Sequence, residues 1–237
     1  MHRFFLNNEG LGNPEITVFD EDFVFQVFKV LRFRISEELV LFNDDGKNYY
    51  YEILELNKKS VRLGLKKIEE NLQVSKRKVR LFFSMTKQME KVEFVLQKCT
   101  EIGVSEFFPL ISQRTERRIL EKRDRLCRIL KEATEQSGGS QIPILHEERS
   151  LKEEFLADRE GFVPVFAHLS GEKIDFGNFL DFSKIDLFIG PEGGFSEDEM
   201  IEAKKSGFYC LKFSERTFRA ETASVAISSL FLLNNNS

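Results

Sequence analysis

Short alternating runs of apolar and polar residues fill the first 70 positions of the chain. Strand-like runs, separated by polar turn segments at 43–46 and 57–60, occupy residues 39–42, 49–56 and 61–65. A helical spacing of apolar residues interrupts them from Glu21 to about Leu31. Several short strands joined by hairpin turns are typical of a small barrel. The pattern therefore predicts a β-barrel domain over residues 1–70.

The pattern changes after residues 71–78, which are polar, lack periodicity and are predicted to be an interdomain linker. Strand-like and helical segments then alternate. The predicted strands are 79–83, 107–111, 142–145, 162–167, 185–189 and 208–213, and the longest predicted helices are 89–102 and 117–136. This alternation predicts an α/β domain over 79–237, with a mostly parallel sheet covered on both faces. Ligands bind beyond the carboxyl ends of such strands, so the segments after Ala167, Ile189 and Phe213 are candidate binding loops.

One of these loops is rich in glycine and leads directly into a helical segment. Its residues are Ile189, Gly190, Pro191, Glu192, Gly193, Gly194 and Phe195. Ser196 and Glu199 form a capping-box pattern that predicts the start of the helix. Glu192 and the acidic residues 197–199 would repel a phosphate, which favours a neutral or cationic ligand bound by backbone groups. A tight turn without a ligand explains this loop, taken alone, equally well.

Composition and charge restrict the class of protein. Apolar residues make up 41% of the 237 residues and charged residues 31%, which is ordinary for a globular protein. A formal net charge of −4 means that nucleic-acid binding would need basic residues gathered locally. Cys99, Cys127 and Cys210 form no CxxC pair, so a cytoplasmic protein without a disulfide framework or zinc site is expected. No run approaches the ~20 apolar residues of a membrane span, and no histidine has metal-like spacing, so neither a membrane nor a metal is expected.

Four segments together resemble a known family. They are Met1–Phe5, Gln97–Val104, Glu135–Gly138 and Phe213–Ala223, and the glycine-rich loop Ile189–Phe195 belongs to the same resemblance. In order and spacing they are similar to segments of the bacterial 16S ribosomal RNA (uracil-N3) methyltransferases, which belong to the SPOUT class of knotted methyltransferases. The resemblance covers nearly the whole chain. It implies a PUA-like RNA-binding first domain, a trefoil knot in the second domain, S-adenosylmethionine as cofactor, 16S ribosomal RNA within the small ribosomal subunit as partner, and a homodimer.

The resemblance also implies that three loops hold the cofactor, mostly through backbone groups. The residues assigned to it are His168, Leu169, Ile189, Gly190, Pro191, Glu192, Gly193, Gly194, Leu211, Phe213, Ser214, Glu215, Arg216, Phe218 and Thr222. The chain departs from the family at two points. The family usually has Leu-Gly-Pro where this chain has residues 213–215, and arginine where it has Gly139.

The chemistry that the resemblance implies is removal of a weakly acidic proton from N3 of uracil as the methyl group arrives. Arg216 and Arg219 would stabilise the negative charge that collects on O2 or O4. Glu221 would accept the proton, directly or through water. Phosphate anchoring explains the two arginines equally well, and Glu221 also suits the first turn of a helix.

Basic and polar residues in both domains are candidates for RNA contacts. The resemblance favours Arg3, Arg32, Arg34, Lys98 and Gln136, and Arg114 is a candidate because it follows the end of a predicted strand. Clusters of basic residues are more often a solvated face, and Lys98 can pair with Glu101 on the same helix. Three other functions stay open: a tRNA or 2′-O-ribose methyltransferase of the same class, a noncatalytic RNA-binding assembly factor, and an enzyme that binds a nucleotide phosphate in its glycine-rich loop.

Overall fold

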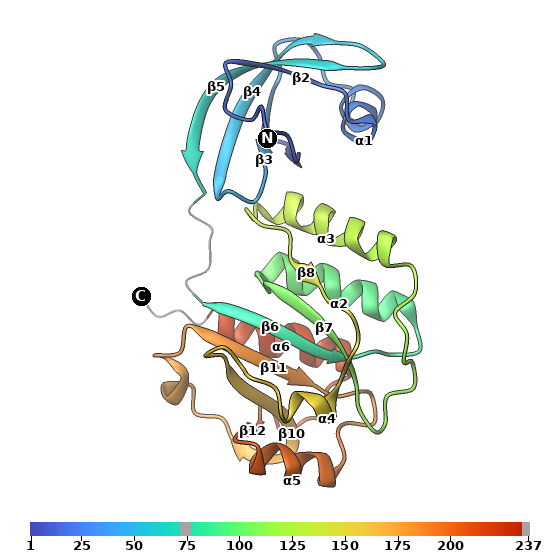
Figure 1. Cartoon of the computed structure of the whole chain (residues 1–237), viewed down its shortest axis with the longest axis vertical. Coiled ribbons are helices and arrows are strands. Elements are labelled where there is room, and N and C mark those ends of the chain that lie inside the picture. The colour runs from blue at the N-terminus through green and yellow to red at the C-terminus, as the bar shows by residue number, and fades with distance from the viewer. Residues whose placement is uncertain (72–76, 234–237) are drawn as a thin grey trace. The chain divides into compact units, whose positions relative to one another are not determined.

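The computed structural model describes residues 1–71 and 77–233 (Figure 1). These residues form two compact units. The first unit contains residues 1–71 and Thr134–Ile142, and the second contains residues 77–133 and 143–233. Of the predicted linker 71–78, residues 72–76 lie outside the described residues, and Lys78 already belongs to a strand.

The first unit is built on a five-stranded sheet with the order β1-β3-β4-β5-β2. Its elements are β1 (Arg3–Phe5), β2 (Glu15–Val18), α1 (Glu21–Phe25), the π-helix η1 (Gln26–Val30), β3 (Glu38–Phe42), β4 (Lys47–Leu56) and β5 (Val61–Glu70). β1 pairs with β3 in parallel, and the other neighbouring strands are antiparallel. The predicted helix at 21–31 is present, with its second half wound as the π-helix. Phe23 and Val27 from this helical segment pack into the same core as Leu41 and Tyr51 of the sheet.

The segment Thr134–Ile142, which the sequence pattern placed in the second domain, belongs to the first unit. The Phe5 N–H donates to the Glu135 carboxylate over 2.8 Å, and the Arg3 guanidinium donates to the Gly139 carbonyl over 2.9 Å. The Ile142 N–H donates to the Asp44 carboxylate over 2.9 Å. These bonds are made by groups more than 90 residues apart in sequence, which is why local patterning did not reveal them.

The second unit is built on a parallel sheet with the order β12-β10-β11-β6-β7-β8, and β9 also pairs with β7. Its elements are β6 (Lys78–Ser84), α2 (Met89–Ile102), β7 (Glu106–Ile111), α3 (Arg123–Ser137, whose last residues belong to the first unit), β8 (Ile144–Leu145), β9 (Arg149–Ser150), α4 (Leu151–Glu154), β10 (Val163–Lys173), the 3-10 helix η2 (Phe176–Phe179), β11 (Lys184–Ile189), α5 (Glu197–Lys205), β12 (Tyr209–Lys212) and α6 (Ala220–Leu233). Every strand pair described in this sheet is parallel. The predicted α/β domain with a parallel sheet is confirmed. The trefoil knot stays a prediction.

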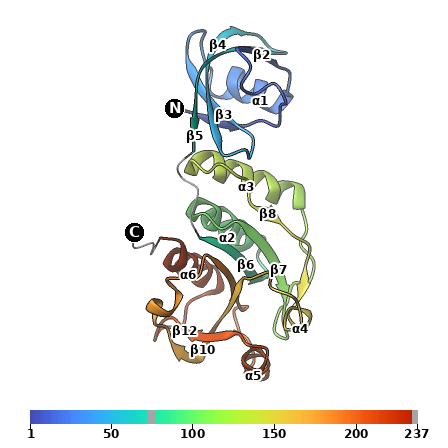
Figure 2. The ribbon, with the colours of Figure 1, turned by 60° about the vertical axis from the view of Figure 1, so that its left-hand side comes forward.

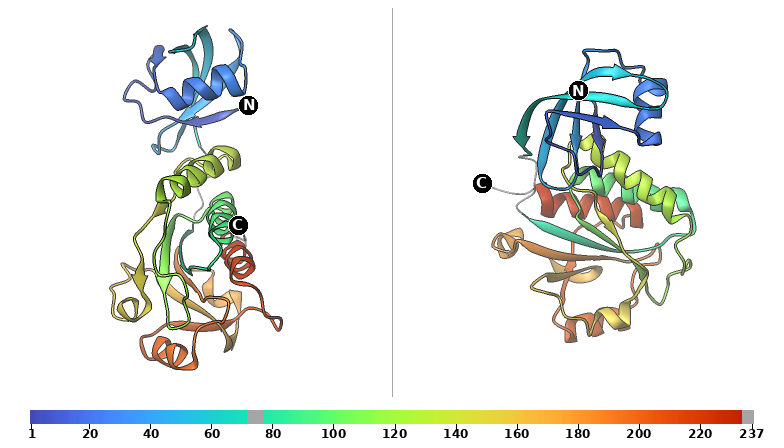
Figure 3. Two further views of the ribbon diagram at one scale, coloured as in Figure 1. Left: turned by 90° about the vertical axis from the view of Figure 1, so that its right-hand side faces the viewer. Right: turned by 45° about the horizontal axis from the view of Figure 1, so that its top comes forward.

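Helices cover both faces of this sheet, as Figures 2 and 3 show. α2 and α6 pack against each other, and α6 also contacts β6 and β11. On the other face, Leu151 of α4 and Met200 of α5 share a core with Phe82, Phe108 and Phe188 of the strands. The rings of Phe108 and Phe188 stack on opposite sides of Phe82, with centroids 4.4 and 4.3 Å away. Many of the chain's phenylalanines therefore serve packing.

A buried ionic network lies at the centre of the sheet. Asp186 of β11 stands opposite Arg80 of β6, and two hydrogen bonds of 2.6 and 2.8 Å join their side chains. The Arg159 guanidinium approaches the same carboxylate to 3.3 Å and also pairs with Glu154 at 2.8 Å. Burial raises the pKa of the Asp186 carboxyl, and the charges and hydrogen bonds of the two arginines oppose that shift. Two guanidinium groups thus share one carboxylate that is completely buried, and Arg159 has Glu154 as a second partner.

One predicted helix is shorter than expected. The charged segment 117–136 was predicted to be helical throughout, but α3 begins only at Arg123. Lys122, just before it, has φ of +57°, a left-handed conformation that a helix interior does not allow. The Leu120 N–H donates instead to the Glu148 carboxylate, and its side chain is buried. Tertiary contacts therefore override the helical spacing of this segment.

We expect Asp186→Asn to lower the free energy of unfolding by about 3–5 kcal/mol, because it removes the buried counter-charge of Arg80 and one of the two carboxylates that pair with Arg159. The measurement is urea unfolding followed by circular dichroism. Glu160→Gln is a matched control, since Glu160 approaches Arg80 only to 3.7 Å and its side chain is 75% exposed. That control should change the free energy by less than about 1 kcal/mol. Equal, small losses in both variants would contradict the role given to Asp186.

Candidate functional site

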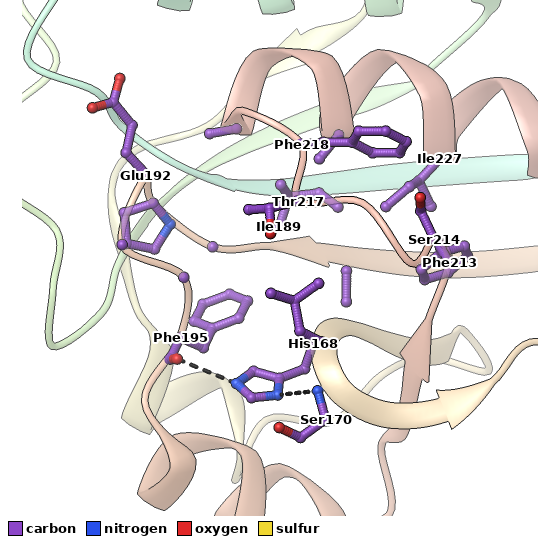
Figure 4. A pocket seen from close by; sticks show the side chains of 18 of the residues that line it. His168, Ser170, Ile189, Glu192, Phe195, Phe213, Ser214, Thr217, Phe218 and Ile227 are labelled. Atoms are coloured by element: carbon purple, nitrogen blue, oxygen red, sulfur yellow. Dashed lines mark hydrogen bonds between the residues drawn. The ribbon is translucent and has the colours of Figure 1, made fainter.

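The three predicted loops meet at a cavity of about 410 Å³ in the second unit (Figure 4). They follow the carboxyl ends of β10, β11 and β12, which are neighbouring strands. The predicted cofactor residues that line the cavity are His168, Leu169, Ile189, Gly190, Pro191, Glu192, Gly193, Gly194, Leu211, Phe213, Ser214, Arg216 and Phe218. The three segments that follow these strands therefore line one cavity, and cofactor binding by their residues stays a prediction.

The glycine-rich loop turns tightly because two of its glycines are required. A Cβ atom on Gly190 would lie 2.9 Å from the Phe195 nitrogen, closer than real Cβ contacts allow. Gly194 has φ of +67°, and its N–H donates to the Pro191 carbonyl over 2.8 Å. The predicted capping box is confirmed: the Glu199 N–H donates to Ser196 Oγ, and the Ser196 N–H donates to the Glu199 carboxylate. The close approach of Gly190 to Phe195 thus fixes the start of the loop, and the capping box fixes its end.

The first predicted loop is a bulge within a strand. β10 was expected to end at Ala167, but it continues to Lys173 with a shift in register between Ala167 and Glu172. A Cβ atom on Gly171 would lie 2.7 Å from the Leu211 carbonyl carbon, so the bulge packs directly on the backbone of β12. Three residues of the bulge, His168, Leu169 and Ser170, line the cavity.

His168 connects the bulge to the glycine-rich loop. The Ser170 N–H donates to its Nδ1 over 3.1 Å, so Nδ1 is an acceptor. Nε2 then carries the proton and donates to the Phe195 carbonyl, 3.3 Å away, as drawn in Figure 4. The tautomer of His168 therefore follows from its two partners.

Two cationic side chains support the glycine-rich loop from outside the strands. The Arg114 guanidinium donates to the Gly193 carbonyl over 2.7 Å and to the Phe195 carbonyl over 3.4 Å. Lys91 of α2 donates to the Glu192 carboxylate. Arg114 was predicted to contact RNA because it follows a strand, and the structure gives it a position in the wall of this cavity.

The cavity is less acidic than the sequence predicted. Lys91 pairs with the Glu192 carboxylate, and the Glu199 carboxylate accepts from the Gln113 N–H as well as from the helix cap. The lining also contains Arg114 and Arg216. A phosphate would therefore be repelled less strongly than the acidic residues in the sequence indicate.

Two predicted cofactor residues do not line the cavity. Glu215 pairs with Lys212 at 2.6 Å, and Thr222 is exposed on α6. The lining residues that the sequence missed are Arg114, Ala167, Ser170, Phe195, Glu197, Thr217, Ala220, Ala223 and Ile227. Most adjoin a predicted residue in sequence. The three residues from α6 recur at helical spacing, a signal that the sequence did contain.

A second cavity, of about 420 Å³, shares a wall with the first. Arg219 lines it, whereas Arg216 lines the first cavity, so the two predicted catalytic arginines are separated. Both side chains are exposed. The Glu221 Oε1 atom lies 3.8 Å from the Lys91 Nζ atom. The Glu221 Oε2 atom is buried and has no hydrogen-bond partner among the residues that the structure describes.

The residues predicted to bind RNA differ in their surroundings. Arg3 donates to Asn48 as well as to Gly139 and lies over the Phe42 ring, and burial lowers the pKa of its guanidinium. Lys98 pairs with Glu101 at 2.7 Å. These two side chains thus have partners within the protein. Arg32, Arg34 and Gln136 are exposed. RNA contacts by all five stay predictions.

Two negative findings concern only residues 1–71 and 77–233. No helix in them combines the length and apolar character needed to cross a bilayer. No group of three or more histidine, cysteine, aspartate or glutamate side chains in them is arranged to hold a metal ion.

Comparison with known families gives two matches. Residues 73–232 match the profile of an RNA methyltransferase domain. Residues 27–66 match the profile of an RNA methyltransferase PUA domain. Together the matches span both units of the structure.

Similar proteins match over most of their length. Ribosomal RNA small subunit methyltransferase E of Helicobacter pylori (strain ATCC 700392 / 26695) is 30% identical, over 86% of this chain and 88% of its own. The protein of the same name from Rickettsia conorii is 26% identical, over 99% of this chain and 97% of its own.

Two solved structures are also similar. That of ribosomal RNA small subunit methyltransferase E from Neisseria gonorrhoeae, bound to S-adenosylmethionine, has a TM-score of 0.86 and 26% identity, covering 97% of this chain and 95% of its own. A putative methyltransferase of Legionella pneumophila with bound S-adenosylmethionine has a TM-score of 0.87 and 28% identity, covering 97% and 96%.

We expect Gly190→Ala to destabilise the protein by about 1–3 kcal/mol, because the added methyl group must displace Phe195 from its buried position. Gly193→Ala is a matched control in the same loop, since its Cβ would lie 3.5 Å from the Arg114 Cδ atom, an ordinary contact. Thermal unfolding of the two variants and the wild type is the measurement. Equal midpoints for Gly190→Ala and wild type would show that the loop does not need this glycine.

Proposed function

We propose, because the chain belongs to the ribosomal RNA small subunit methyltransferase E family of RNA methyltransferases, that it transfers a methyl group from S-adenosylmethionine to N3 of a uridine in 16S ribosomal RNA. The observation that carries the proposal is the meeting of three loops from adjacent parallel strands at one cavity. The protein would act in the cytoplasm, as a homodimer, on RNA of the small ribosomal subunit.

The cavity suits S-adenosylmethionine in size and in chemistry. Its volume of about 410 Å³ lies within the range of small-molecule sites. Phe213, Phe218 and Ile227 provide an apolar surface for the adenine ring, beside the backbone of the glycine-rich loop. Glu197 and Arg216 carry charges opposite to those of the ammonium and carboxylate groups at the amino-acid end of the cofactor. The glycine-rich loop can approach the cofactor closely because Gly190 has no side chain.

When bound, the cofactor supplies a methyl carbon attached to a positively charged sulfur. The protein holds the uracil N3 in line with that carbon and stabilises the negative charge that develops on the uracil. The N3 proton passes to the Glu221 carboxylate, the N3 electron pair forms the new N–C bond, and the C–S bond breaks with its electrons on sulfur. Arg219 lines the adjoining cavity, where it can stabilise the negative charge on a uracil oxygen.

The test is whether the purified protein methylates the expected atom. Small subunits from a strain that lacks the gene are incubated with the protein and S-adenosylmethionine, and the nucleosides are identified by mass spectrometry. We expect 3-methyluridine. Methylation of a ribose hydroxyl or of tRNA would indicate another activity of the same class. Cofactor binding in calorimetry without methylation of any RNA would favour an assembly factor.

We expect Arg219→Ala to lower kcat by about 10²–10³, the usual loss for one oxyanion-stabilising donor, with little change in cofactor affinity. Raising the pH should partly restore the rate, because more of the substrate N3 is then deprotonated without help. Single-turnover rates at saturating RNA across pH provide the measurement. Arg216→Ala is the comparison, and it should weaken cofactor binding because Arg216 lines the first cavity. If Arg219→Ala weakens only RNA affinity and flattens its salt dependence, Arg219 binds a phosphate.

A further inference from the structure

The second cavity is placed where a methyl acceptor must lie. Glu192, Thr217 and Phe218 line both cavities and form their common wall. Gln88, Lys91 and Arg219 complete the lining of the second cavity. Methyl transfer requires the acceptor atom to come within about 3–3.5 Å of the donor carbon. A ligand beside the common wall satisfies that requirement better than one elsewhere on the unit.

Lys91 is a charged group in this cavity to which the sequence analysis gave no role. It is the third residue of α2, and its side chain is only 20% exposed. Its ammonium group bonds to Glu192 and lies 3.8 Å from Glu221 Oε1. The hydrogen bond to Glu192 raises the pKa of Lys91, and the charge of Glu221 adds to the shift. Lys91 is therefore a fixed positive charge between a residue of the cofactor loop and the predicted proton acceptor.

The hydrogen-bonding groups here match one edge of one base. The imide edge of uracil presents a carbonyl oxygen, an N–H and a second carbonyl oxygen. The cavity wall supplies two cationic donors, Lys91 and Arg219, and the adjacent Glu221 carboxylate supplies an acceptor. Glu221 is not among the residues that line either cavity, but its side chain is 14% exposed and its Oε1 atom lies 3.8 Å from the Lys91 Nζ atom in the cavity wall. Cytosine has an acceptor at N3 and would leave the carboxylate unpaired.

We propose that this second cavity binds the imide edge of the acceptor uracil, with Lys91 donating to one carbonyl oxygen, Arg219 to the other, and Glu221 accepting from N3–H. Phe218 in the common wall provides a face on which the base can stack. Lys91 is then a catalytic residue, because it touches the oxygen on which charge develops. The inference rests on the proposed function and adds to it a base-binding site and a basis for choosing uracil over cytosine.

A purely structural role for Lys91 makes a different prediction. If Lys91 only supports the glycine-rich loop through Glu192, its loss should weaken S-adenosylmethionine binding, and Glu192→Gln should have the same effect. If Lys91 contacts the base, Lys91→Met should leave the cofactor Kd nearly unchanged and lower the chemical rate. Lys91→Arg keeps the charge and should restore part of that rate.

The experiment combines calorimetry with S-adenosylmethionine and single-turnover methylation of small subunits from the deletion strain, at saturating cofactor and across pH. We expect Lys91→Met to be slower by about 10²–10³, with partial recovery at high pH. Lys205→Met is the matched control and should behave as wild type, since Lys205 is exposed on α5 and lines neither cavity. Ribosomal RNA with cytidine at the modified position should not be methylated by the wild type.

Four outcomes have distinct meanings. A normal rate for Lys91→Met at saturating cofactor overturns the inference, and so does a rate loss that a raised cofactor concentration fully restores. Efficient methylation of the cytidine substrate overturns the specificity argument. Absence of uridine methylation by the wild-type protein refutes the proposed function itself, which separates that failure from the failure of the role given to Lys91.

Discussion

The parallel pairing of β10 with both β11 and β12 is the constraint from which the site follows. Parallel neighbours end at the same edge of a sheet, so the segments that leave these strands must meet there. The bulge at 168–171, the glycine-rich loop and the loop before α6 are those segments. Gly171 lets the bulge lie directly on β12, and Gly190 lets the second loop fold back on itself. The cavity is therefore a consequence of topology, with glycines at the two closest backbone approaches.

Two cationic side chains beside the glycine-rich loop both hold its conformation and offset part of its negative charge. Arg114 holds two of its carbonyl groups, and Lys91 holds its carboxylate. A loop fixed by such partners loses little further freedom when a ligand binds, so less binding energy is spent on ordering it. The same two cations remove much of the negative charge that the sequence shows in this region. A zwitterionic ligand suits this balance better than a simple cation.

Local patterns in the sequence predicted most of the second unit. The helix at Met89–Ile102 and the parallel strands are where the apolar spacing placed them, because burial on one face or on both leaves a clear period. Features that depend on distant partners were missed. The continuation of β10 beyond Ala167 depends on β12, and the late start of α3 depends on Glu148 and the conformation of Lys122. The pairing of Lys91 with Glu192 joins residues 101 positions apart, which no local pattern can show.

The assignment of Thr134–Ile142 to the first unit has a consequence for how the gene can be divided. The chain enters the first unit twice, so no single cut separates the two units cleanly. A fragment that ends at residue 71 would lack Glu135 and Gly139, the acceptors for Phe5 and Arg3, and the Ile142 donor to Asp44. Deletion of residues 1–71 would leave the last turn of α3 without its partners, such as the Phe5 N–H that bonds to Glu135. Exchange of the first unit between relatives would thus have to carry residues 1–71 and Thr134–Ile142 together.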